Sequence, residues 1–180
     1  MPPTGFSAAT ALAEIRAGAS LQSVTDAHAM DEIVGAVRDA LTGLRLGVSS
    51  LDEAGLHTVA GLELWSIAEI AGHALKAGEA ADAIARSLAL GRVPPGVRVP
   101  YGEPGEATAT RDSILEAIRH AEDRLATTLV LAAGGITFPH DELGALTARG
   151  WILFSGVHAA AHLHQAAAVV RARPATIVKA

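Results

Sequence analysis

Residues 151–171 read WILFSGVHAAAHLHQAAAVVR, and the rest of the chain is expected to be organised around this stretch. At the 100° per residue of an α-helix, six of its side chains share one sector of the helix surface: Trp151, Phe154, His158, His162, Gln165 and Val169. The two aromatic residues and the valine indicate that this sector faces a hydrophobic core. Imidazoles in a core need partners, because an unpaired polar group is costly to bury. Two rings spaced four residues apart can direct their nitrogens at one point, which a metal ion can occupy.

The composition favours a single helical domain. The 180 residues are half hydrophobic, rich in alanine and only 3% aromatic, which favours close-packed helices over a sheet. We therefore expect residues 1–180 to form one all-α domain. The net charge of −5, without a basic cluster, argues against a nucleic-acid partner. The chain has no cysteine, so it offers neither a disulfide nor a thiol nucleophile of its own.

No targeting or membrane segment is expected. The first basic residue, Arg16, follows the mildly apolar N-terminal stretch, whereas a secretory signal carries its charge before that stretch. We therefore predict a cytoplasmic protein. Residues 150–170 carry no charged side chain, but three histidines, a glutamine and a serine argue against burial in lipid.

Hydrophobic periodicity predicts an up-down four-helix bundle with long connecting loops. The expected bundle helices cover residues 23–46, 66–90, 109–132 and 147–173, and a short helix at 7–17 lies within an N-terminal extension, residues 1–20. Ser66 and Glu69 form the clearest start signal, a capping box. Thr108 or Thr110 caps the third helix. The connections, including the Pro/Gly-rich residues 92–106 and residues 136–146, are expected to lack strands.

Two of these segments resemble the DinB-like (YfiT/DinB) superfamily. Residues 65–91, WSIAEIAGHALKAGEAADAIARSLALG, are similar to its first motif, a Trp-Ser entry followed by a histidine one helical step past the cap. Residues 138–165, FPHDELGALTARGWILFSGVHAAAHLHQ, resemble its second motif, in which a His-Pro-like loop precedes a helix with H-x-x-x-H and a nearby glutamine. Here the loop reads Pro139-His140, the reverse order. Together the motifs cover about a third of the chain.

The resemblance implies an up-down four-helix bundle, commonly dimeric, with a divalent metal held by three histidines. Carried over position by position, the ligands are His73, His158 and His162. The alternative, from the residues alone, is that His158 and His162 are hydrogen-bonded core histidines without a metal. Three imidazoles suit zinc or nickel best, with iron and copper also compatible.

Several other polar residues are candidates for supporting roles. Glu69 either orients the His73 ring or only closes its capping box, and Gln165 either faces the site or satisfies a backbone group. His140 either reaches the mouth of a pocket or is simply exposed. The long Pro/Gly-rich loop carries Arg92, Arg98 and Tyr101. These residues either bind an anionic substrate over the metal or are surface residues without a binding role. The other histidines are expected to lie outside the site: His28, His57, His120 and His164.

Two functions fit these residues. In the first, the protein is a DinB-like metal-dependent enzyme, a hydrolase or a thiol-dependent transferase or isomerase, acting on a small-molecule substrate. The metal would make a water or thiol nucleophilic at neutral pH. Because the chain has no cysteine, a thiol would come from a low-molecular-weight cofactor. The alternative is a non-catalytic metal-binding or stress-associated interaction protein, since no carboxylate except Glu69 accompanies the three histidines.

The fourth helix also predicts an association. Leu153, Val157, Ala160 and Ala167 form a second apolar face, directed away from the histidines. One bundle core uses one stripe of a helix, so the second face needs a cover. A two-fold homodimer is the expected solution, and the alternative is that the N-terminal segment folds over this face.

Overall fold

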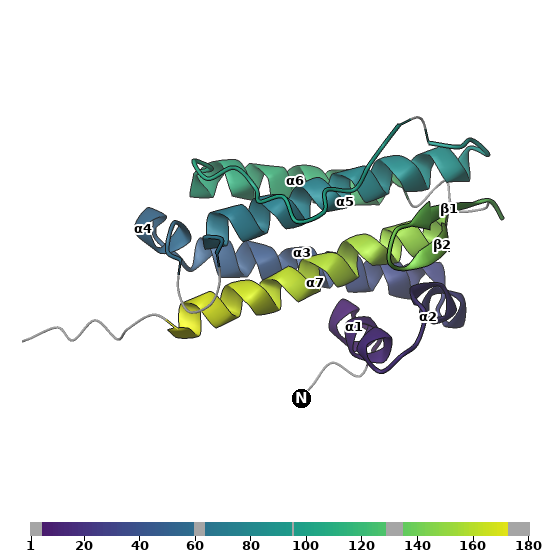
Figure 1. Cartoon of the computed structure of the whole chain (residues 1–180), viewed down its shortest axis with the longest axis horizontal. Helices are drawn as coiled ribbons and strands as arrows, with labels where there is room; N and C mark the ends of the chain where they lie inside the picture. The colour runs from purple at the N-terminus through teal and green to yellow at the C-terminus, as the bar shows by residue number, and fades with distance from the viewer. Residues whose placement is uncertain (1–4, 60–63, 95, 129–134, 173–180) are drawn as a thin grey trace, which may run out of the picture.

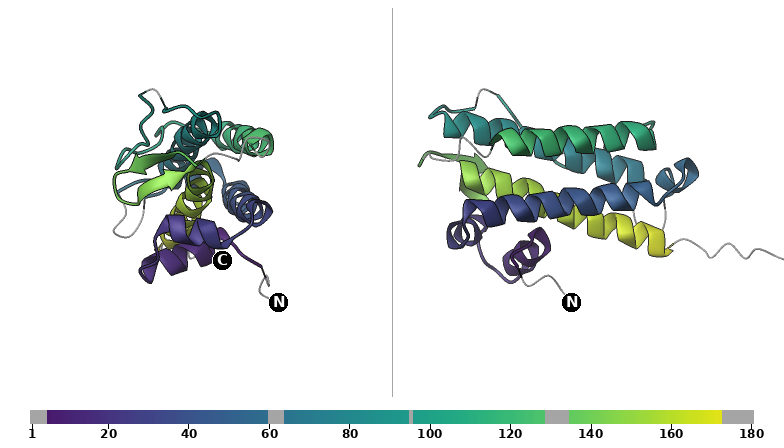
Figure 2. Two further views of the ribbon diagram at one scale, coloured as in Figure 1. Left: turned by 90° about the vertical axis from the view of Figure 1, so that its right-hand side faces the viewer. Right: turned by 180° about the vertical axis from the view of Figure 1, so that it is seen from behind.

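Four long helices form a bundle in the computed structural model, which describes residues 5–59, 64–94, 96–128 and 135–172 (Figure 1). The elements are α1 (Ala8–Arg16), α2 (Leu21–Ala27), α3 (Met30–Ser49), α4 (Glu53–Leu56), α5 (Ile67–Ala89), α6 (Arg111–Thr128), β1 (Thr137–His140), β2 (Gly144–Thr147) and α7 (Ala148–Ala172). Helices α5 and α3 both pack against α7 on one side and against α6 on the other. Figure 2 shows this arrangement along the bundle axis. The predicted all-α class and four-helix bundle are confirmed.

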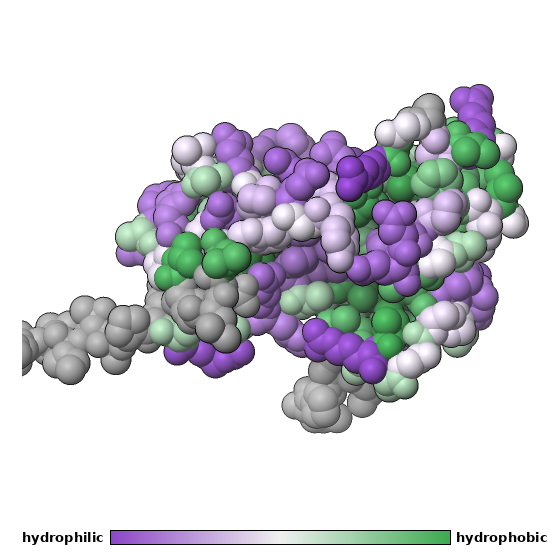
Figure 3. All heavy atoms as spheres, in the orientation of Figure 1, coloured by the Kyte–Doolittle hydropathy of each residue, from purple (hydrophilic) through white to green (hydrophobic). Residues whose placement is uncertain are grey.

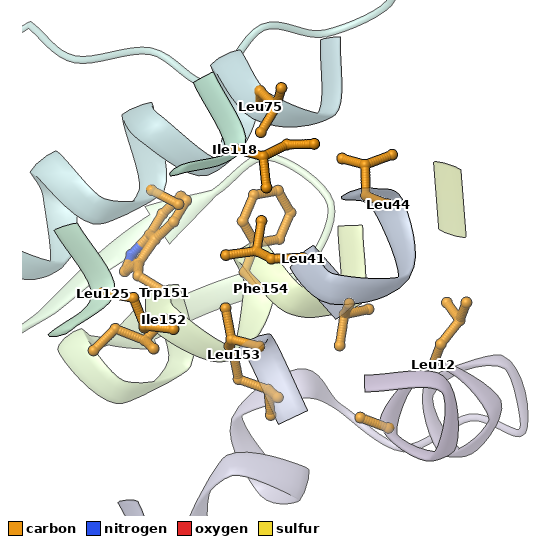
Figure 4. Close-up of a cluster of buried hydrophobic side chains, with 14 of the residues drawn as sticks. Leu12, Leu41, Leu44, Leu75, Ile118, Leu125, Trp151, Ile152, Leu153 and Phe154 are labelled. Atoms are coloured by element: carbon orange, nitrogen blue, oxygen red, sulfur yellow. The ribbon is translucent and has the colours of Figure 1, made fainter. Parts of the chain in front are cut away.

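The core is built where the apolar stripes of the helices meet. Trp151 and Phe154 of α7 are buried there with aliphatic side chains of the other bundle helices (Figure 4). Small residues allow α7 to approach α3 closely, since a Cβ atom at Gly156 would lie 3.0 Å from the Cα of Val37. The many alanines therefore serve close packing, with the large side chains concentrated in the interior.

The order of helix directions differs from the predicted up-down alternation. Arg86 near the end of α5 donates to the carbonyl of Arg124 near the end of α6 (3.0 Å). These two helices consequently run parallel. Residues 96–110 form a crossover loop that returns along the length of the bundle before α6 begins, as the teal trace in Figure 1 shows. The Pro/Gly-rich connection is long enough for this crossover, whereas an alternating bundle needs only short loops.

The predicted helix at 23–46 is two helices. Ser20 caps α2, accepting a hydrogen bond from Ser23 N (3.0 Å), and the Glu32 carboxylate accepts one from Ala29 N (2.9 Å) at the start of α3. The break between them lies at residues 28–29. Arg149 of α7 donates to the carbonyls of Thr25 and His28 at the end of α2. These tertiary contacts stabilise a break that periodicity alone does not indicate.

The other predicted starts are in place. Ser7 caps α1, and Thr110 caps α6 by accepting from Ser113 N (3.2 Å). Ser66 and Glu69 form the capping box of α5, with Ser66 N donating to the Glu69 carboxylate (2.7 Å). The predicted ends at residue 132 and at Pro174 lie outside the described residues.

Residues 137–147 form an antiparallel hairpin, where a loop without strands was predicted. Phe138 pairs with Leu146 and His140 with Gly144, whose φ of +76° suits glycine at the end of the connection. Leu146 is fully buried, and Phe138 packs against the core. Four-residue strands offer too short an alternation to be recognised against helical neighbours.

The second face of α7 is covered in part within the chain, since Ala167 is half-buried. Helix α1 packs on α7, and Ala8 of α1 shares a buried cluster with Ala36, Ala40, Ala159 and Ala160. Leu153 and Val157 are buried as well. The N-terminal segment thus covers part of the face that was predicted to pack in a dimer, and the homodimer itself stays a prediction. In the described part of the chain, no helix is long and apolar enough to cross a membrane.

Gly78 offers a test of the packing between α5 and α7. A Cβ atom at Gly78 would make an ordinary contact, 3.8 Å from Ser155 Cβ, beside a cavity of about 40 Å³. Gly78→Ala should therefore raise the free energy of unfolding by about 0.5–1 kcal/mol, because glycine weakens a helix interior. Urea denaturation measures the change, and a lower stability would mean that the two helices leave no room for a methyl group.

Candidate metal centre

His73 of α5 and His158 and His162 of α7 converge on one point. One ring nitrogen from each lies within 4.8 Å of the others, and His158 Nε2 lies 3.2 Å from His73 Nε2. Among the described residues, no other group of three histidine or acidic side chains is arranged to hold a metal. The antiparallel packing of α5 on α7 produces this convergence, since His73 is nearly two helix turns inside α5 and the other two rings face it from successive turns of α7.

The crossover loop fixes the tautomer of His73. The ring is 4% exposed, and its Nδ1 lies 2.6 Å from the carbonyl oxygen of Glu103. A carbonyl oxygen only accepts, so Nδ1 carries the hydrogen and Nε2 presents its lone pair to the other two histidines. Metal-ligating histidines are typically held by such a bond from the second ring nitrogen.

Two glycines allow the loop to reach His73. Gly105 N donates to the Glu69 carbonyl (2.9 Å), and a Cβ atom at Gly105 would lie 2.6 Å from that oxygen and 2.8 Å from His73 N. On the helix side, a Cβ at Gly72 would lie 3.1 Å from Gly105 Cα. Any side chain at position 105 would collide with the backbone of α5, so this contact between the loop and the helix requires glycine there.

Gln165 contacts the Nδ1 atom of His162, as the Glu103 carbonyl contacts that of His73. The Nδ1 atom of His162 lies 2.7 Å from Gln165 Oε1, one helix turn further along α7. When the amide oxygen accepts this bond, the lone pair of His162 is on Nε2. Of the alternatives for Gln165, the structure thus shows a contact with a site histidine.

The environment of His158 disfavours its charged form. Burial, reinforced by repulsion from His162 and His73, lowers the pKa of His158 to about 3. A neutral imidazole is the form that binds a metal. The donor set of three imidazole nitrogens, two of them in the required tautomer, therefore fits a divalent transition metal.

Glu69 does not contact the His73 ring. Its carboxylate accepts from Ser66 N and Ser66 Oγ (2.7 and 2.8 Å), which completes the capping box. Of the two roles considered for Glu69, the structure shows the cap. Its backbone carbonyl nevertheless anchors the crossover loop through Gly105, a role that sequence reasoning missed.

A cleft of about 960 Å³ opens over the three histidines. His140 lines this cleft, with its ring 4.8 Å from that of Phe154 and 5.5 Å from that of Trp151. Arg98 and Tyr101 of the crossover loop also line it, whereas Arg92 does not. The closeness of His140 to the site follows from the hairpin, which places the end of β1 beside the start of α7.

The remaining histidines lie elsewhere, as expected. His28 stacks on Phe6, His57 lies 3.9 Å from Glu53, and His120 lies 3.1 Å from Glu116 on an exposed face. His164 is exposed on the opposite side of α7 from the site.

Fold and site together define a four-helix bundle with a group of three histidines suited to metal binding. The chain belongs to the DinB superfamily, whose family model matches residues 34–166. No curated protein matches the sequence. Two solved structures share the fold at a TM-score of 0.62 over 78% of this chain. One is TT2238, a four-helix bundle protein, at 21% identity over 99% of its length, and the other is the mycothiol-dependent maleylpyruvate isomerase, at 15% identity over 61% of its length.

Gly105→Ala tests the support that the loop gives to His73. The added methyl cannot fit beside the Glu69 carbonyl, so the loop must lift and the bond from His73 to Glu103 is lost. We expect zinc affinity to fall about 10–100-fold. Gly35→Ala is the matched control, because a Cβ there meets nothing within 4 Å. Titration calorimetry with zinc compares the two, and equal affinities would contradict the role of the loop.

The depressed pKa of His158 predicts an acid-sensitive fold in metal-free protein. The unfolded chain takes up a proton at this residue below its ordinary pKa of 6.5, whereas the folded chain does so only near 3. Stability is therefore lost as the pH falls below 6.5, by up to about 1.4 kcal/mol per pH unit from this group. His158→Gln should flatten the dependence. Urea midpoints between pH 7 and pH 5 provide the measurement, and identical slopes in both proteins would contradict it.

Proposed function

We propose that this protein is a metal-dependent enzyme that holds a divalent metal through His73, His158 and His162 and acts on a small molecule. The observation that carries the proposal is the pair of hydrogen bonds from His73 Nδ1 to Glu103 O and from His162 Nδ1 to Gln165 Oε1. They set both rings in the tautomer that ligation requires. Zinc or nickel is the expected metal, with iron also compatible with three imidazoles.

Three protein ligands leave coordination positions for substrate, as in catalytic rather than structural zinc sites. When bound, the ion would act as a Lewis acid and make a water or thiol nucleophilic near neutral pH. The chain's own residues hold the histidine rings in place and shield them from water. Trp65 and Phe154 pack on the rings of His73 and His158, both at 5.1 Å between centroids, and limit the access of water.

The reaction class proposed is hydrolysis or thiol-dependent transfer or isomerisation. The fold shared with a mycothiol-dependent isomerase supports the thiol branch. Because the sequence has no cysteine, that thiol would be a low-molecular-weight cofactor. The cleft of about 960 Å³ has room for such a molecule together with a substrate.

A non-catalytic metal-binding protein is the second candidate. The observation in its favour is that the Glu69 carboxylate is taken up by the capping box, and that the group of described residues arranged to hold a metal contains histidines but no carboxylate. A turnover screen separates the two. Metal-loaded protein is assayed with thiol acceptors, simple esters and amides, and the His158→Ala variant serves as the blank. Metal binding without turnover on any substrate class would favour the second candidate.

Metal removal provides the direct test of the site. Binding to the folded state alone stabilises it by about 2.7 kcal/mol when free metal exceeds its dissociation constant a hundredfold, which corresponds to roughly 5–10 °C in melting temperature for a chain of this size. A chelator should lower the melting temperature of untagged protein, and zinc or nickel should restore it. His73→Ala, His158→Ala and His162→Ala should each weaken the response.

His28→Ala and His120→Ala are the controls, since both histidines lie outside the site. They should respond to chelator and metal as the wild type does. A hydrogen-bonded histidine core without metal predicts lower stability in the buried variants but no dependence on the chelator. If verified metal-free protein melts at the same temperature with and without zinc or nickel, the proposed site is wrong.

A further inference from the structure

The cleft is much larger than a metal ion with a bound water requires. Its volume of about 960 Å³ compares with about 30 Å³ for a water molecule, and it lies at the upper end of the range for small-molecule sites. The three histidines occupy only part of its lining. The remaining surface is available to the body of an organic ligand.

That remaining surface is largely apolar. Trp151 and Phe154 of α7 form one wall, Phe138 and Leu143 of the hairpin another, and Val97 and Val99 of the crossover loop a third. Leu12 and Ile15 of α1 extend the lining beyond the bundle itself. Figure 3 shows apolar surface within the hollow on this face, bordered by hydrophilic residues. An apolar wall contributes affinity only to a ligand that has apolar surface to bury.

The charged groups of the cleft come from its two surface loops. Arg98, Asp141 and Glu142 are its charged lining residues, and all three are exposed. Glu142 accepts a hydrogen bond from Tyr101 (2.8 Å), which joins the hairpin to the crossover loop. Because opposite charges are mixed and solvated there, they give little preference for a highly charged ligand.

His140 adds a neutral hydrogen-bond donor to this apolar lining. Its Nδ1 accepts from the backbone N–H groups of Glu142 (3.2 Å) and Leu143 (3.4 Å), so the neutral ring carries its hydrogen on Nε2. The ring packs on Phe154, which in turn packs on His158 (5.1 Å between centroids). The donor of His140 is thus in the same cleft as the three site histidines, separated from His158 by one aromatic ring.

We propose that the cleft binds a molecule with an apolar body and a small oxygen- or sulfur-containing head group. The head group lies at the three histidines and accepts a hydrogen bond from His140 Nε2, and the body lies along the hairpin and the crossover loop. This inference rests on the proposed function, because it names the class of molecule that the metal site acts on.

Straight-chain hydroxamates test the inference, since they join a metal-binding head group to an alkyl chain of chosen length. Zinc-loaded protein is titrated with acetohydroxamate, butanohydroxamate, hexanohydroxamate and octanohydroxamate in a calorimeter. We expect affinity to rise about two- to fourfold for each added methylene group, because each one buries apolar surface. Equal affinity along the series would overturn the apolar body.

Two variants separate the body from the head group. Leu143→Ser should reduce the gain per methylene group, whereas Leu46→Ser, at a residue 60% exposed on α3 outside the cleft, should not. His140→Phe keeps an aromatic ring against Phe154 and should weaken every hydroxamate by the same factor, about 3–10-fold. His140→Asn, which retains an acceptor for the turn N–H groups, should give the same parallel loss. Unchanged affinity in both variants would overturn the contact with His140.

Zinc titrated alone distinguishes this inference from the proposed function. If zinc does not bind, the proposed metal site is wrong, and the hydroxamate titrations then measure only how the metal-free cleft binds the alkyl chain. If zinc binds but chain length has no effect, the metal site stands and the apolar ligand is wrong. Leu143→Ser and both His140 variants should bind zinc as the wild type does, which also shows that they are folded.

Discussion

The site depends on the hydrogen bond from His73 Nδ1 to the carbonyl of Glu103. It joins a buried helical residue to a loop that is exposed to solvent, and it determines which nitrogen of His73 faces the other two histidines. The bond exists because the crossover loop, residues 96–110, returns along the bundle and because Gly105 and Gly72 allow this loop to touch α5. The parallel arrangement of α5 and α6 is therefore a condition for the geometry of the site.

Helix α7 is packed on several sides, and each side contacts a different part of the molecule. One side meets α3 and α5 in the core, another meets α1, and a third presents two histidines to α5 and the cleft. The hairpin before it brings His140 into the same cleft, and the N-terminal helix contributes Leu12 and Ile15 to the lining. Elements outside the four bundle helices thus shape the space in which a ligand would bind.

Helical periodicity and capping were sufficient to predict the class of fold and the starts of α1, α5 and α6. They also placed His158 and His162 on one face, and the resemblance added His73. The break at residues 28–29, the direction of α6 and the hairpin were not predictable, because each depends on contacts between distant segments such as Arg149 with α2. The hydrogen bond from His73 to the Glu103 carbonyl was not predictable either, since a backbone carbonyl leaves no signature in the sequence. His140 was predicted to lie in a loop, whereas it ends strand β1 of the hairpin, and its place in the lining of the cleft follows from that hairpin.

The most direct test of the central claim is X-ray absorption at the zinc edge of untagged protein loaded with one equivalent of zinc. Coordination by His73, His158 and His162 predicts three imidazole nitrogens at about 2.0–2.1 Å together with oxygen ligands, such as water, in the open positions. The imidazole contribution should fall in His162→Ala protein. A zinc environment dominated by oxygen ligands, or one that is the same in the variant, would show that the three histidines do not form a metal site.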